Sequence, residues 1–306
     1  MQNSIEEKVT GVLKKLSEMD VEALAEYDVK EEAGEKYSSS RGWTDKILEY
    51  KKAEDGFDAD VSLFSIVCYT IAFPYVLDAD TEEGICEHTE PQKIIRHNVG
   101  QKYEIMYEDN KPQLAYHGDT MNSFQTIFNQ INRFHAGESF QNEMEEYAKW
   151  VHTVGNFIPV PHLYDGRNSG TFNAARYAAT KDFWDVTLCW IYRWYQEGRS
   201  RETLGKLVGN SRNNIRACEY WLKRFENWDQ FVEKNYLQDF VYNKEYKVEK
   251  YGMPKEFWEG HLKEGSDIMP GLEAAKQFLR TVPGLIEMRG RRIAREIKRK
   301  DEICDQ

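Results

Sequence analysis

Residues 182–196 read DFWDVTLCWIYRWYQ, and this stretch decides the fold class. Trp184, Leu188 and Ile191 recur at the spacing of one helical face, and further aromatic residues occupy the other faces. A helix that is apolar nearly all round needs cover on several sides. We therefore expect this helix at the centre of a large core, with Trp190 and Trp194 mostly buried.

Helical patterns also dominate the sequence around this stretch. Apolar residues at three- and four-residue spacing predict helices over residues 124–134, 140–151, 213–242 and 284–300. Apolar and polar residues alternate on both sides of a turn-like segment, which predicts a β-hairpin near residues 101–118. The predicted fold class is mainly α (α+β), a helical body with a small β-hairpin or sheet.

The chain opens with an amphipathic helix. Val9, Leu13 and Leu16 lie on its apolar face. A charged, serine- and glycine-containing segment at residues 31–42 suggests a joint, so we expect an N-terminal helical arm at 1–40 and a single α-rich body at 41–306. The apolar face needs cover from the body or from another chain. The second alternative predicts self-association or capture of a protein partner.

The composition favours a cytoplasmic protein without a cofactor. The 306 residues include 18 Tyr, 15 Phe and 8 Trp, enough for an aromatic core that needs no metal to hold it together. Five widely spaced cysteines fit neither a disulfide framework nor a zinc site, and the N-terminus lacks the apolar run of a signal peptide. The apolar stretch at residues 61–77 contains Pro74 and hydroxyl side chains, which predicts a buried element rather than a membrane helix.

Charge is unevenly distributed. The net charge of −11 argues against a general binder of nucleic acid or anionic membranes. Residues 193–224 nevertheless hold eight basic against three acidic side chains, and residues 280–300 hold eight against two. If the two basic segments share a face, nucleic acid is a candidate ligand. The arginines considered for this role are Arg199, Arg201, Arg212, Arg289 and Arg292.

A polar block precedes and enters the aromatic helix, and it resembles that of a bacterial family classed only as a domain of unknown function. The family pattern is Thr-x-Gly, a following proline, Asn-x-x-Arg, and then Asp-x-x-Asp-x-Thr-Leu-x-x-Ile-x-Arg-x-Tyr. The matching residues here are Thr153, Gly155, Pro159, Asn173, Arg176, Asp182, Asp185, Thr187, Leu188, Ile191, Arg193 and Tyr195. The likeness covers the C-terminal half, and Tyr177 stands where the family usually has glycine. The resemblance implies a shared fold but no reaction.

Two interpretations of this block stay open. Asp182 at the start of the helix and Asp185 in its first turn are typical of an N-cap and of an acid that interacts with the helix dipole. Alternatively, Arg176 converges with Asn173 and the two carboxylates on a ligand. The polar network considered comprises Asn156, Asn173, Arg176, Asp182, Asp185 and Arg193.

A second resemblance concerns catalysis. Glu87, His88 and Pro91 are similar to the Glu-His-x-x-Pro opening of some His-Asn-His nucleases, and His152 with Asn156 is similar to a later part of their motif. That likeness implies that a neutral His88 activates water while His152 or a carboxylate holds a divalent metal. The alternative places His88 on a solvated loop.

Phosphate loops, dinucleotide fingerprints, nucleophile elbows and zinc-protease motifs are absent from the sequence. We therefore expect a non-enzymatic protein-binding or inhibitory protein of bacterial or phage origin, with a role in bacteria–phage conflict. The alternative is a metal-dependent His-Asn-His-like nuclease or another phosphate-ester enzyme.

Overall fold

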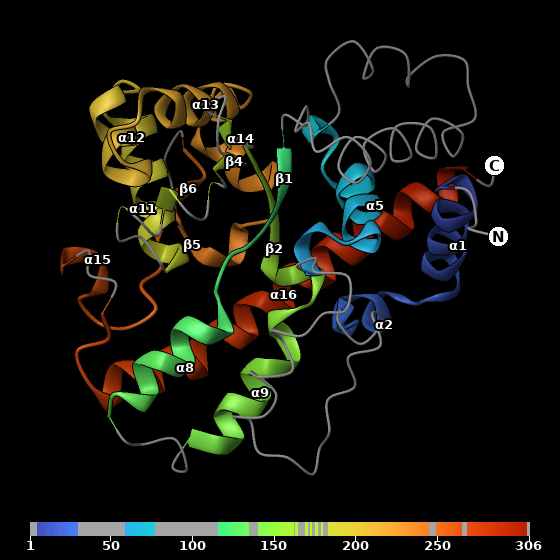
Figure 1. The fold of residues 1–306 in the computed structure, drawn as a ribbon, viewed down its shortest axis with the longest axis horizontal. Coiled ribbons are helices and arrows are strands. Elements are labelled where there is room, and N and C mark those ends of the chain that lie inside the picture. Colours follow the sequence, from blue (N-terminus) through green and yellow to red (C-terminus); the bar gives the residue numbers. More distant parts are fainter. Residues whose placement is uncertain are drawn as a thin grey trace.

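The computed structural model describes residues 5–29, 59–76, 116–134, 140–161, 183–244, 249–264 and 268–304, together with short pieces at 163–164, 169–170, 172, 175–176 and 179. The fold is mostly helical, as predicted (Figure 1). The described residues also form three two-stranded antiparallel sheets. The α-helices of the N-terminal half are α1 (Ile5–Glu18), α2 (Val21–Glu26), α5 (Leu63–Ala72), α8 (Phe124–Asn132) and α9 (Gln141–Val151). Those of the C-terminal half are α11 (Trp184–Gln196), α12 (Arg201–Val208), α13 (Arg212–Leu222), α14 (Trp228–Lys234), α15 (His261–Glu264) and α16 (Leu272–Cys304).

The longest helix, α16, organises the molecule. It crosses the whole fold, with α1 and α2 beside one end and α8 and α9 beside the other (Figure 1). The sequence predicts this helix only over residues 284–300, because Pro283 lacks the N–H of a helix interior. The helix continues through Pro283 since Phe278, Val282 and Ile286 are fully buried on both sides of it. Packing of the apolar face thus outweighs the local cost of the proline.

A glycine lets α16 approach the chain between α9 and the first sheet. This segment is the short 3-10 helix η4 (Val154–Asn156), and a Cβ on Gly155 would lie 2.1 Å from the carbonyl oxygen of Ile286 and 3.0 Å from the Cα of Gly290. No larger side chain fits there without moving one backbone or the other. The Thr-x-Gly of the family pattern therefore marks a packing contact between η4 and α16.

The two helices of the predicted N-terminal arm pack into the body. Val9 and Leu16 of α1 and Leu24 and Ala25 of α2 are buried, and α2 lies against α16. The ammonium of Lys298 donates to the carbonyl oxygens of Leu16 and Ser17, at 2.8 Å and 3.0 Å. The apolar face of α1 is thus covered by the body. The predicted joint at 31–42 lies outside the described residues.

The first sheet joins distant parts of the chain. Strand β1 (Tyr116–Thr120) pairs antiparallel with β2 (Phe157–Pro161). Most of the hairpin predicted at 101–118 lies outside the described residues, and Tyr116, near its end, begins β1. The other strands form the pairs β3 (Leu163–Tyr164) with β4 (Ser169–Gly170) and β5 (Val241–Asn243) with β6 (Tyr251–Pro254).

Helix α11 lies in the core, as its composition predicts. Trp184, Leu188, Ile191 and Trp194 are fully buried, whereas Trp190 is only partly buried and packs against the core from its edge. The helix begins at Trp184 after Phe183, which caps it without a side-chain hydrogen bond. The N-cap position is therefore that of Phe183 and not that of Asp182, which lies outside the described residues.

Two further predicted elements, at 213–242 and at 61–77, can be compared with the structure. The helix predicted over 213–242 is divided into α13, α14 and the 3-10 helix η5 (Gln238–Phe240). The glycines around residue 205, among them Gly205 and Gly209, predict an exposed loop, but α12 occupies this segment. The apolar stretch at 61–77 contains the buried α5, between the 3-10 helices η1 (Ala59–Val61) and η2 (Pro74–Val76). None of the helices within the described ranges is long and apolar enough to cross a membrane.

Two tryptophans of α11 should differ sharply in a stability test. Trp194→Ala leaves a large cavity and should lower the free energy of unfolding by about 3–5 kcal/mol. Trp190→Ala should cost clearly less, because that side chain is partly exposed. Urea titrations followed by circular dichroism measure both values, and equal losses would contradict the assignment of the core.

Deletion of residues 1–29 should destabilise the whole protein, because it uncovers apolar surface on α5 and α16. Melting followed by circular dichroism checks this expectation. A truncated chain that melts at the unchanged temperature would show that α1 and α2 contribute nothing to the body.

Candidate functional site

Asp185, one of the predicted site residues, forms a buried pair with His261. Its Oδ2 lies 2.6 Å from Nδ1 of His261 and 2.9 Å from the backbone N–H of Phe257, and both side chains are buried. Burial raises the pKa of the Asp185 carboxyl, and the hydrogen bond from His261 opposes that rise. The Trp258 ring stacks on His261, with the ring centroids 3.5 Å apart. This arrangement fastens α15 to α11.

His261 was missed by the sequence analysis. It lies 76 residues beyond its partner, and no motif surrounds it. Only the tertiary structure identifies the pair.

The other members of the predicted polar network do not share one site with Asp185. Asn156 is buried, and its amide donates to the carbonyl oxygens of Asn122 and Val151, at 3.0 Å and 2.9 Å. Arg176 is buried beside α11, donates to Oγ1 of Thr187 at 3.3 Å and lies over the Trp184 ring. Buried contacts of this kind are typical of residues that stabilise the fold.

Two residues of that network and one histidine of the nuclease prediction lie outside the described residues. These are Asn173, Asp182 and His88. Arg193 is exposed over the Trp190 ring, away from the buried groups. His152 is mostly buried at the end of α9. Within the described ranges, no three His, Cys, Asp or Glu side chains are grouped in a way that could hold a metal ion.

Arg289 is corrected from a candidate nucleic-acid contact to a core residue. Its guanidinium is fully buried and donates to the carbonyl oxygens of Gly155, Phe157 and Asn235, at 2.7, 2.8 and 3.0 Å. Burial lowers the pKa of Arg289 to about 10. A side chain enclosed in this way cannot reach a ligand.

Two further candidate arginines have internal partners. Arg292 forms a bidentate salt bridge with Asp239, in which Nε donates to Oδ2 at 2.7 Å and Nη2 donates to Oδ1 at 3.1 Å. Arg199 hydrogen-bonds to the carbonyl oxygen of Glu226 and lies over the rings of Trp194 and Tyr195. Arg289 and Arg292 of the basic segment at 280–300 therefore do not form one basic surface with the segment at 193–224.

Arg201 and Arg212 remain, and they lie on the helix pair α12 and α13. This pair occupies the far side of the molecule from α1 (Figure 1). Gly209, Asn210 and Ser211 join the two helices, and Gly209 has φ 76° and ψ 173°. Only glycine adopts that conformation readily, so the sharp turn depends on it. The side chain of Asn214 donates to the carbonyl oxygen of Val208 at 3.3 Å and closes the turn.

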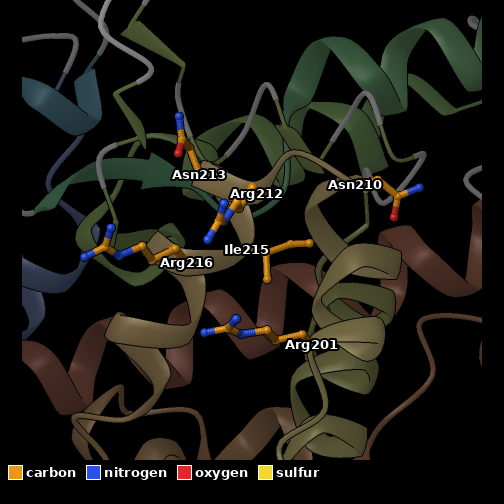
Figure 2. A pocket seen from close by; sticks show the side chains of 6 residues that line it. All are labelled: Arg201, Asn210, Arg212, Asn213, Ile215 and Arg216. Atoms are coloured by element: carbon orange, nitrogen blue, oxygen red, sulfur yellow. The ribbon is translucent and has the colours of Figure 1, made fainter.

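A basic cavity of about 660 Å³ opens between these helices (Figure 2). Its lining comprises Arg201, Asn210, Arg212, Asn213, Ile215 and Arg216. Figure 2 shows Arg201 extending from α12 towards α13, where its Nε donates to Glu219 at 2.8 Å. Arg212, Asn213 and Arg216 are exposed.

Few acidic side chains of the described residues offset the positive charge of the cavity. Residues 201–224 contain six basic and two acidic side chains. Within the part of the chain that the structure describes, Arg212 and Arg216 make no ion pair, and Glu219 is shared between Arg201 and Lys223. Such a surface suits a ligand that carries several negative charges.

Comparison with protein families matches residues 88–293 to a family of unknown function, DUF6994. The match begins further towards the N-terminus than the C-terminal half in which the family pattern is visible. Comparison with curated proteins and with solved structures found no match.

Arg289→Met should destabilise the protein although it removes a buried charge. Three backbone carbonyls lose their donor, and each buried unsatisfied carbonyl costs about 1–3 kcal/mol. We expect the free energy of unfolding, measured by urea titration, to fall by about 3 kcal/mol or more. Arg280→Met, an exposed change on the same helix, is the control. An unchanged Arg289→Met midpoint would contradict a structural role.

Proposed function

The chain belongs to the DUF6994 family, whose function is unknown, and we propose that it is a non-enzymatic binding protein whose ligand is nucleic acid, held at the surface of α12 and α13. The observation that carries the proposal is the cavity with three arginine and two asparagine side chains in its lining. Guanidinium groups bind phosphate oxygens in two-pronged geometry, and both side-chain types hydrogen-bond to base edges.

The distribution of charge supports a local contact of this kind. The whole chain has a net charge of −11, yet residues 201–224 carry a net charge of +4, from six basic and two acidic side chains. At physiological ionic strength, charges further away than about 8 Å are largely screened. A phosphate seated against α13 therefore responds mainly to Arg212 and Arg216.

The N-terminal helices support a protein partner less well. The face of α1 that was considered for partner capture packs on the body through Val9 and Leu16. Binding of a protein partner, a role in bacteria–phage conflict and metal-dependent cleavage through His88 and His152 stay predictions. A cytoplasmic location is part of the proposal, and the buried thiols of Cys189 and Cys218, which form no disulfide among the described residues, support it.

Neutralising the cavity should weaken nucleic-acid binding and its dependence on salt. The full chain carrying both Arg212→Ala and Arg216→Ala is titrated against a fluorescein-labelled 25-base-pair duplex at several salt concentrations, with anisotropy as the readout. Each phosphate contact that is lost lowers the slope of log K against log salt by about one. We expect a lower affinity at every salt concentration, and a slope that falls by about one for each of the two arginines that binds a phosphate.

A matched variant with Arg280→Ala and Arg295→Ala provides the control. It removes the same charge from exposed arginines of α16, away from the cavity. We expect it to bind like the unmodified protein. Equal losses in both double variants would mean that only net charge matters, and the absence of binding by the unmodified protein to DNA and RNA would refute the proposal.

A further inference from the structure

We infer that the nucleic acid is double-stranded DNA and that α13 reads its major groove, with α12 and α13 acting as a helix-turn-helix. This inference rests on the proposed function and goes further, because it names the form of the ligand, the groove and the residues that read bases.

The geometry of the turn points to this motif. A helix-turn-helix joins two helices by a turn of three or four residues that often contains glycine. Here α12 ends at Val208, α13 begins at Arg212, and Gly209 opens the three-residue turn in a conformation that favours glycine. The glycines of this segment alone predict a loop, whereas the structure has two helices and places Gly209 in the turn between them.

The packing of the pair holds α13 firmly on the body. Leu204, Leu207 and Val208 of α12 and Cys218 and Trp221 of α13 are buried. The two helices face each other at Gly205, since a Cβ there would be in van der Waals contact with Cδ1 of Ile215, at 3.7 Å.

Helix α11 braces both members of the pair from behind. The hydroxyl of Tyr195 donates to the carbonyl oxygen of Leu222 at 2.7 Å, and the hydroxyl of Thr203 donates to Glu197 at 3.1 Å. The exposed side of α13 is therefore presented on a rigid support, which reading of base edges requires.

The exposed side chains at the start of α13 are those that read DNA. In helix-turn-helix proteins, the N-terminal residues of the second helix contact base edges. Arg212 and Asn213 occupy the first turn of α13, and Arg216 follows one turn later. Arginine pairs with the O6 and N7 of guanine, and asparagine pairs with the N6 and N7 of adenine. The first turn of α13 carries no acidic side chain that would repel the phosphates.

Arg201 is suited to the DNA backbone. It lies at the N-terminus of α12, the helix that crosses the backbone in this type of complex, and its side chain is 70% exposed. Duplex RNA is disfavoured as the ligand because its major groove is too deep and narrow for side chains to read. We therefore expect the protein to bind duplex DNA more tightly than duplex RNA of the same sequence.

The test separates sequence reading from simple charge attraction. Duplexes are first selected from a random library by the unmodified full chain. The binding constants of the unmodified protein and of Asn213→Ala are then measured by anisotropy on the selected duplex and on a scrambled duplex of equal composition. Loss of a two-pronged base contact should weaken binding to the selected duplex by about 5- to 150-fold and leave the scrambled duplex nearly unaffected.

Asn142→Ala is the matched control, because Asn142 is also exposed and is also the second residue of a helix. Circular dichroism verifies that both variants are folded. A library that stays random after selection, or an Asn213→Ala protein that binds the selected duplex unchanged, would overturn major-groove reading. Duplex RNA bound as tightly as selected DNA would overturn it too.

The experiments distinguish failure of base reading by α13 from failure of nucleic-acid binding as a whole. If α13 does not read bases but nucleic acid binds at the cavity, the Arg212→Ala, Arg216→Ala protein still loses affinity for every duplex. If the proposed function is wrong, no library member is retained at all.

Discussion

The buried guanidinium of Arg289 is the interaction on which the rest of the fold depends. It links α16 to η4, to β2 and to the end of α14 through three backbone carbonyls. These segments come from different parts of the chain, and among the described residues the hydrogen-bond partners of Arg289 are backbone carbonyls and not carboxylates. A charge of this kind persists in the core only when fixed dipoles replace its hydration. Gly155 makes the arrangement possible because it brings its carbonyl oxygen within 2.7 Å of Nη1 of Arg289.

Local patterns predicted the helices well but not their ends or their partners. The periodicity around Leu188 and Ile191 identifies α11 as a central helix, because burial on all sides leaves a clear signal in composition. The passage of α16 through Pro283 and the pairing of β1 with β2 depend on distant residues. Strand β2 reads FIPVP and is buried throughout, so it lacks the alternation by which a half-buried strand is recognised.

The candidate site was predictable only in part for a similar reason. A count of basic residues identifies a positive segment, but it cannot distinguish Arg289, which is fully buried, from Arg212, which is exposed. Likewise, the spacing of Asp185 suggested either a helix-end acid or a ligand contact, and its actual partner is a histidine 76 residues away. Burial and long-range pairing are properties of the assembled core, and a single sequence carries little information about them.

The position of α16 in the chain also bears on biosynthesis. Every described element that it contacts, from α1 and α2 to η5, precedes it in the chain. Those elements expose their apolar surfaces on the ribosome until α16 has emerged, so the core closes late and the nascent chain is a candidate for chaperone capture. Helices α11, α12 and α13 are continuous in sequence, and the contacts of α12 with α11 and with α13 are local enough to form while translation is still under way.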